Sequence, residues 1–176
     1  TFNENILRKC KELSGLSVES KVSYEKIEFQ EGMLFTHRGL SGPSILQISS
    51  YWRLGKEIKI NLCPDVNIFN YLQDKKKVNP KQEILSIVNE LIPKRLAGMI
   101  CEDLKISGKI ADMSKKQIMK ITESINNWIV QPTGSEGYRT AEVTLGGVDT
   151  KDLSSKTMMS KKNKGLFFIG EVVDVT

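Results

Sequence analysis

Hydrophobic residues recur along this chain with two different periods, and the change of period separates β-rich segments from a helical one. In residues 16–35 and 58–62 apolar and polar side chains alternate, as in half-buried strands of an antiparallel sheet or small barrel. In residues 65–128 the apolar positions follow a helical repeat, and alternation returns at 129–131 and 138–145. We therefore expect an α+β fold in which a small helical subdomain interrupts an antiparallel, β-barrel-like layer.

The helical segment is predicted to contain four short amphipathic helices, because four start signals lie within it. One signal is a capping box, in which serine is followed three residues later by glutamine. We expect the apolar stripes of these helices to form core and to carry no chemistry. The start signals are Asp65, Asn79-Pro80, Pro93, and Ser114 with Gln117.

The changes of period predict four segments. Residues 1–64 are a β-rich subdomain that includes an amphipathic helix at 41–53, and residues 65–128 are the helical subdomain. Residues 129–146 return to the β layer, and residues 147–176 form a C-terminal segment of different character.

A strand, a turn and a helix are predicted in succession within residues 33–52. The apolar start of this stretch breaks at residues 36–40 and restarts as a helix for which Ser41 is a suitable N-cap. Such an arrangement directs backbone N–H groups and a positive dipole end at one spot, which suits an anion or a polar cofactor edge. His37 and Arg38 lie at that spot. The alternative is an ordinary connection in which His37 has a structural role.

Composition indicates a globular protein. The 176 residues are 39% hydrophobic and 27% charged, which suffices for one domain or two small ones with a core. No run approaches the roughly 18 apolar residues of a membrane span, and no signal peptide is visible. We expect a cytoplasmic protein without a membrane partner. Because the cysteines at 10, 63 and 101 are far apart and there is one histidine, we expect no metal site.

The net charge of +5 comes mostly from lysine runs at 75–77 and 161–164. These runs lack interleaved aromatic residues and any RNA-binding signature. We interpret them as solvated surface, and on this basis we do not expect a nucleic-acid partner.

The segment Gly165–Glu171 has the pattern of a buried strand that carries a carboxylate at its C-terminal end. In open α/β sheets, ligands bind outside the carboxyl ends of the strands. Glu171 could accept two hydrogen bonds from a sugar or ribityl diol there, while Gly170 would let the ligand approach the backbone.

Three sequence blocks together resemble a known family. They are LFTHRGLSGPSILQISSYW at 34–52, AEVTLGGV at 141–148 with KTMMSK at 156–161, and GLFFIGEVVDV at 165–175. With them the chain is similar to the middle and late part of the bacterial putative NAD(P)/FAD-dependent oxidoreductases often called aminoacetone-oxidase-like. The resemblance implies an insert region set into a Rossmann-like FAD domain, of which residues 147–176 would be a remnant.

The resemblance also implies roles for two sets of residues, with hydride passing between a small-molecule substrate or NAD(P)H and the flavin. The catalytic set would face the substrate and comprises His37 and Arg38, beside Thr36. The cofactor set would lie by the flavin ring or its ribityl-phosphate portion and comprises Gly146, Gly147, Val148, Gly170, Glu171 and Asp174.

The chain departs from that family because it has no GxGxxG strand–turn–helix, the element that holds the FAD pyrophosphate. We therefore expect a piece of a longer flavoenzyme that binds FAD weakly and is inactive alone, with the rest of the FAD-binding domain as its partner. We expect residues 141–176 to rearrange or to pack against the barrel.

Two alternatives remain open. The basic β-plus-helix unit could be an interaction module for an acidic partner or nucleic acid, or it could be a scaffold that covers the substrate side and forms a homodimer. Salt-dependent retention on DNA or heparin beyond that of a +5 protein distinguishes the first, and light scattering tests the dimer.

Overall fold

The computed structural model describes residues 1–141 and 144–174 of the chain. The chain divides into two compact units, Thr1–Ser135 and Glu136–Thr176. Within the described residues, no helix is both long enough and apolar enough to cross a membrane.

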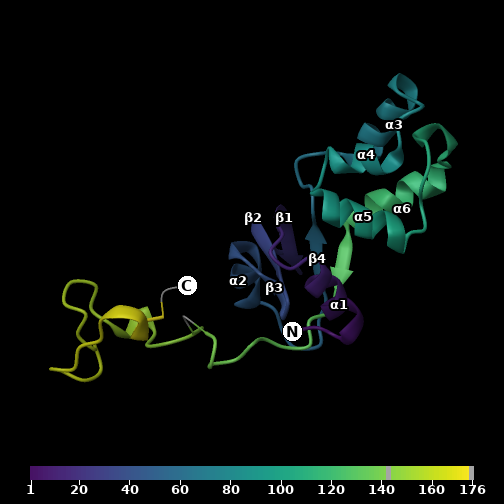
Figure 1. The fold of residues 1–176 in the computed structure, drawn as a ribbon. Coiled ribbons are helices and arrows are strands. Elements are labelled where there is room, and N and C mark those ends of the chain that lie inside the picture. Colours follow the sequence, from purple (N-terminus) through teal and green to yellow (C-terminus); the bar gives the residue numbers. More distant parts are fainter. Residues whose placement is uncertain (142–143, 175–176) are drawn as a thin grey trace. The chain divides into compact units, whose positions relative to one another are not determined.

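A curled, five-stranded antiparallel sheet forms one part of the first unit, with strand order β3-β2-β1-β4-β5 (Figure 1). Alternate residues of β1 are buried, and Val18 and Val22 among them belong to the core. The expected α+β class with an antiparallel, barrel-like layer is therefore confirmed. The elements of this part are α1 (Glu4–Glu12), β1 (Ser17–Tyr24), β2 (Ile27–Thr36), β3 (Gly39–Ser41), α2 (Pro43–Ser49), β4 (Ile58–Asn61) and β5 (Trp128–Val130).

Four α-helices lie between β4 and β5 and form the second part of this unit. Their apolar stripes are buried as predicted; Ile84, Ile87 and Val88 of one helix and Ile118, Ile121 and Ile125 of another have almost no exposed surface. The helices are α3 (Ile68–Val78), α4 (Ile84–Asn89), α5 (Lys94–Asp103) and α6 (Lys115–Asn126), with a short 3-10 helix η1 (Ile110–Asp112) before α6.

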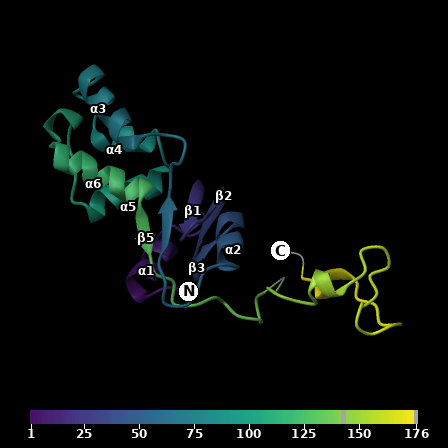
Figure 2. The same ribbon diagram turned by 180° about the vertical axis from the view of Figure 1, so that it is seen from behind.

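The helical part leaves the sheet and returns to it at one place. The backbone N–H of Leu62, just after β4, donates to the carbonyl of Ile125 at 2.8 Å. The Asn126 amide donates to Asn61 Oδ1 at 2.9 Å, and two residues later Trp128 pairs with Ile60 of β4. Figure 2 shows α6 continuing directly into β5. A continuous hydrophobic core therefore joins the sheet to the helices.

The helix starts were predicted with mixed success. The capping box of Ser114 and Gln117 is present at the start of α6. The first of the four helices, however, is capped by Asn67, whose side chain accepts from the Asn70 N–H, and not by Asp65. The helix expected from Asn79 begins at Ile84 instead. A hydrogen bond from the Ile84 N–H to the carbonyl of Gly108 ties that start to a neighbouring loop.

The second unit consists mainly of turns and isolated bridges. A parallel bridge joins Val148 to Val173, and an antiparallel bridge joins Met159 to Phe167. The buried strand predicted over 165–171 is wrong, because Phe167 and Ile169 are exposed and residues Gly170–Val172 form a 3-10 turn. Of the strand predicted over 138–145, residues 142 and 143 lie outside the described residues, and residues 138–140 form a turn.

A polar network fixes α3 to α4 on the surface of the helical part. The Glu90 carboxylate accepts from Lys75 Nζ and Tyr71 Oη at 2.5 Å each, and from Gln82 Nε2 at 2.7 Å. The Lys75 hydrogen bond, followed by those from Tyr71 and Gln82, lowers the pKa of Glu90 to about 2. The folded chain therefore holds this carboxylate ionised at pH values where a free glutamate, with a pKa near ~4.3, is protonated.

This network predicts a specific acid sensitivity. Because the pKa of Glu90 is lower in the folded state than the ~4.3 of a free glutamate, its stabilisation is present above about pH 4.3 and is lost as the pH falls towards 2. When the pH is lowered from about 5 to about 2.5, Glu90→Gln should therefore lose less free energy of unfolding than the wild type, as measured by urea unfolding. Glu102→Gln is the control, since this exposed carboxylate has no ion pair in the described structure. Equal losses in wild type and Glu90→Gln would contradict the prediction.

Candidate functional site

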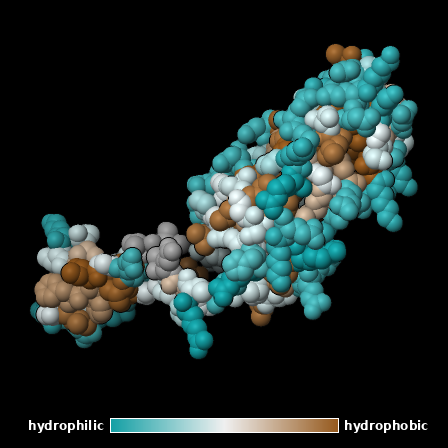
Figure 3. Space-filling model, viewed as in Figure 1, coloured by the Kyte–Doolittle hydropathy of each residue, from teal (hydrophilic) through white to brown (hydrophobic). Residues whose placement is uncertain are grey.

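Lysines from two helices gather on one face of the helical part. Lys75–Lys77 form the last turn of α3, and Lys115 and Lys116 form the first turn of α6, which packs against α3. Hydrophilic residues cover much of the helical part in the view of Figure 3. Positive charges from two separate parts of the sequence therefore lie near the contact between α3 and α6.

The lysines of the α3 run have different roles. Lys75 is held by Glu90, and Lys76 Nζ donates to the backbone carbonyl of Met113 at 2.5 Å. Lys77 instead makes an exposed ion pair with Asp74 at 3.1 Å, of the kind that contributes little to stability. Two of the three lysines therefore connect parts of the helical fold, and Lys77 is the member of the run that lines a pocket.

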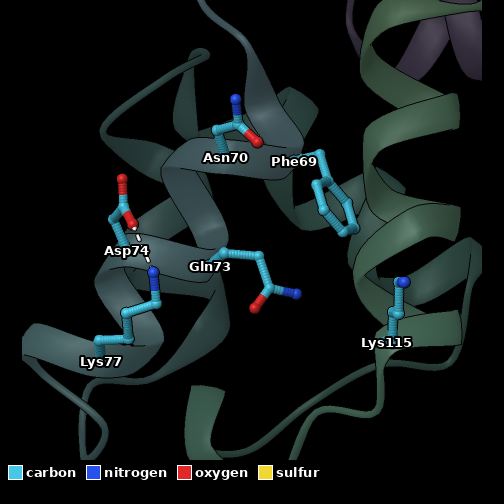
Figure 4. A pocket seen from close by; sticks show the side chains of 6 residues that line it. All are labelled: Phe69, Asn70, Gln73, Asp74, Lys77 and Lys115. Atoms are coloured by element: carbon cyan, nitrogen blue, oxygen red, sulfur yellow. Dashed lines mark hydrogen bonds and ion pairs between the residues drawn. The ribbon is translucent and has the colours of Figure 1, made fainter.

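An open pocket of about 480 Å³ lies between α3 and α6 (Figure 4). The side chains of Phe69, Gln73 and Lys115 face the space between the two helices. The pocket combines an aromatic ring, two carboxamides, one carboxylate and two ammonium groups. Its lining residues are Phe69, Asn70, Gln73, Asp74, Lys77 and Lys115.

A second, shallower surface, lined among others by Lys116 and Lys120, adjoins the pocket and shares Lys115 with it. Lys116 and Lys120 lie four residues apart on α6, so they occupy the same face of that helix. In the described part of the chain, Lys115, Lys116 and Lys120 have no carboxylate within ion-pair distance. We call Lys77, Lys115, Lys116 and Lys120 the α3–α6 lysine face.

The predicted strand–turn–helix has a different geometry from the one expected. Residues 37 and 38 form the turn of a hairpin between β2 and β3, in which Thr36 Oγ1 accepts from the Arg38 N–H and donates to the Gly39 carbonyl. Strand β3 then separates this turn from α2. His37 and Arg38 are exposed and do not lie at the start of that helix.

The start of α2 packs against β2. The N-cap position is Gly42, not Ser41, and its φ of 93° lies in the left-handed region. A Cβ at Gly42 would come 2.8 Å from the carbonyl oxygen of Gly32. The Ser44 hydroxyl donates to the same carbonyl at 3.2 Å. The strand backbone therefore lies close beside the helix start, and the anion site expected there stays a prediction. The catalytic roles of His37 and Arg38 remain predictions.

The structure brings together the two sequence blocks predicted to contact a flavin. The Val148 N–H donates to the Val172 carbonyl at 2.8 Å, and the Asp174 N–H donates to the Val148 carbonyl at 3.0 Å. A Cβ at Gly147 would lie 2.5 Å from the Val172 carbonyl oxygen, so the neighbouring backbone leaves no room for a side chain at this position. Gly146 and Gly170 have positive φ, and Glu171 is exposed. The cofactor roles of all these residues remain predictions.

The thiols are poor nucleophiles in this fold. Burial raises the pKa of Cys10 to about 11 and also raises the pKa values of Cys63 and Cys101. In the residues that the structure describes, no group of three His, Cys, Asp or Glu side chains is placed to hold a metal ion.

Sequence reasoning missed the pocket, although a signal for it was present. Phe69, Gln73 and Lys77 follow one another at intervals of four residues, which places an aromatic, an amide and a cation on one stripe of α3. Phe69 belongs to an apolar stripe of the kind expected to form core, and its ring does pack partly against the core. The contribution of Lys115 could not be read in the same way, because it comes from another helix.

Comparison with known proteins identifies relatives of this chain. The family described as HI0933-like protein barrel and H2TH domain matches residues 1–143. The ribosomal RNA dihydrouridine synthase of Escherichia coli (strain K12) is 46% identical over 182 residues, covering 100% of this chain and 44% of that protein. The protein of the same name from Haemophilus influenzae is 46% identical over 149 residues, covering 84% of this chain and 37% of that protein. The chain thus spans less than half the length of these relatives.

A more distant relative is the 3-dehydro-bile acid delta(4,6)-reductase of Clostridium scindens, 26% identical over 157 residues, which cover 81% of this chain and 38% of that protein. All three relatives are bacterial proteins named as enzymes. None of the three carries the name aminoacetone oxidase that the sequence resemblance suggested.

The comparisons correct two expectations. The first is that the chain is a fragment of an FAD-dependent oxidoreductase or NAD(P)-utilising dehydrogenase of unknown substrate; the relatives at 46% identity are named for ribosomal RNA. The second is that nucleic acid is not a partner, and the same names and the H2TH match contradict it. The alternative, a basic module that binds nucleic acid, is better supported. The lysine runs were judged along the sequence alone, which does not show that lysines of α3 and α6 lie on neighbouring helices.

The close approach at Gly147 yields a prediction for the second unit. In Gly147→Ala the new methyl would meet backbone atoms of Val172 and Asp174, which cannot move aside independently. We expect the bridge between Val148 and Val173 to break, so that the amides of Val148 and Asp174 exchange with solvent at least ~10-fold faster by NMR. Gly98→Ala is the control, since its new methyl would have no atom within 4 Å. Unchanged exchange would show that the chain does not need glycine here.

Proposed function

This chain belongs to the HI0933-like family, described as a barrel and H2TH domain, and we propose that it is the RNA-contacting part of a ribosomal RNA dihydrouridine synthase. The observation that carries the proposal is the 46% identity to such an enzyme over the full length of the chain. A second enzyme of the same name matches 84% of the chain at the same identity.

The α3–α6 lysine face supports RNA as the partner. Nucleic-acid affinity comes largely from lysine and arginine contacts to phosphates, and three of the four lysines of this face have no carboxylate partner in the described structure. They lie on the helical part, for which the H2TH description independently suggests nucleic-acid binding. The net charge of +5 adds a favourable long-range field around this face.

The proposed reaction is a reduction. Dihydrouridine differs from uridine by two hydrogens on the C5–C6 bond of the base, so its formation needs a hydride and a proton. FAD, which the sequence resemblance implies for the longer protein, would in its reduced form be a suitable hydride donor when bound. The more distant relative is also named a reductase.

The cofactor roles expected for the second unit stay predictions. Backbone atoms of Val172 and Asp174 lie close beside Gly147. We therefore assign no step of the reduction to these residues. The part proposed for this chain is to bind the RNA and to orient it for the reaction.

Replacing the lysine face tests this part. A variant with Lys77, Lys115, Lys116 and Lys120 all changed to Gln should bind a ribosomal RNA fragment at least ~10-fold more weakly at low salt. The slope of log affinity against log salt concentration should also fall by up to about 3, because up to four phosphate contacts are lost. Filter binding over a salt series measures both quantities.

A charge-matched control separates this face from overall charge. Its substitutions, Lys11, Lys26, Lys56 and Lys94 to Gln, remove exposed lysines that line neither pocket. This control should keep most of the affinity and the slope. Equal losses in the two variants, or no measurable binding of ribosomal RNA by the wild type, would contradict the proposal.

A further inference from the structure

The pocket between α3 and α6 contains side-chain groups that would not be needed if the lysine face bound phosphates alone. Phosphates need cations, whereas this pocket also presents the ring of Phe69, the carboxamides of Asn70 and Gln73, and the carboxylate of Asp74. Its volume of about 480 Å³ is within the range of roughly 300–1,000 Å³ that is typical of small-ligand sites. These features fit a heterocyclic base better than a phosphate.

Phe69 supplies a surface on which a base can stack. The ring is partly buried against the core, which holds it in place, and its remaining surface lines the pocket (Figure 4). Aromatic side chains of this kind bind bases that are not in a duplex, because only an unpaired base can turn its face to a protein ring.

The amides supply polar groups for the edge of a base. In the described structure the carboxamides of Asn70 and Gln73 have no hydrogen-bond partner, so each offers both a donor and an acceptor. Asp74, although paired with Lys77, can accept from a base N–H. The pocket therefore favours a base over a phosphate at its centre.

Lysines on two different helices flank this centre. Lys77 comes from the C-terminal turn of α3 and Lys115 from the first turn of α6. We propose that the pocket holds one unpaired nucleotide of the RNA, with its base stacked on Phe69 and its edge read by Gln73. Lys77 and Lys115 contact the adjoining phosphates. This inference rests on the proposed function, since it presumes that RNA is the partner.

The test compares an RNA hairpin that has an unpaired loop with a fully paired RNA duplex of the same length. The wild-type chain should prefer the hairpin. Phe69→Leu, which keeps an apolar side chain against the core but removes the ring, should weaken hairpin binding roughly 10-fold and leave duplex binding unchanged. Phe29→Leu, which removes a partly buried ring of β2, is the control and should alter neither. Circular dichroism melting establishes that both variants are folded.

Photo-cross-linking provides a second readout that does not depend on a substitution. A hairpin with 4-thiouridine in its loop should cross-link to a peptide of α3 that contains Phe69. If Phe69→Leu binds the hairpin as well as the wild type, or cross-links fall outside α3 and α6, the pocket proposal is overturned while RNA binding stands. If neither RNA binds the wild type, the proposed function itself is contradicted.

Discussion

The joint between β4 and α6 is the interaction on which the rest of the first unit depends. Residues 62–127 leave the sheet after β4 and the chain returns to it at Trp128, so their placement relies on where the two ends are held. The Leu62 N–H bond to Ile125 and the side-chain bond between Asn126 and Asn61 hold those ends together. Because both bonds lie beside a continuous core, the sheet and the helices are expected to unfold as one unit.

The proposed RNA surface depends on the same joint through α6. This helix carries three lysines of the α3–α6 lysine face in its first half, while its far end is fixed at the sheet by Ile125 and Asn126. Helix α3 is fixed separately, by the contacts of Glu90 and by the Lys76 bond to the Met113 carbonyl. Lys75 and Lys76 make these contacts and hold α3 in place. The lysines of the α3–α6 lysine face are positioned as a result and remain available to a ligand.

The sequence predicted those features that depend on local periodicity. Alternation located β1, β2 and β4, and the helical stripes located the buried faces of α4 and α6. It failed where tertiary contacts decide: Gly39–Ser41 pairs with β2 as a strand, whereas a turn and the N-cap Ser41 were expected there, and residues 165–171 present Phe167 and Ile169 outward. The candidate site was missed for a similar reason, since Phe69 and Lys115 come together only when α3 packs against α6.

The dihydrouridine content of ribosomal RNA tests the central claim most directly. Nucleosides from purified ribosomal RNA can be quantified by mass spectrometry in cells with and without the gene that encodes this chain, with transfer RNA dihydrouridine as the internal control. We predict that dihydrouridine disappears from ribosomal RNA alone and returns when the gene is restored. Unchanged dihydrouridine in ribosomal RNA after deletion would contradict the account.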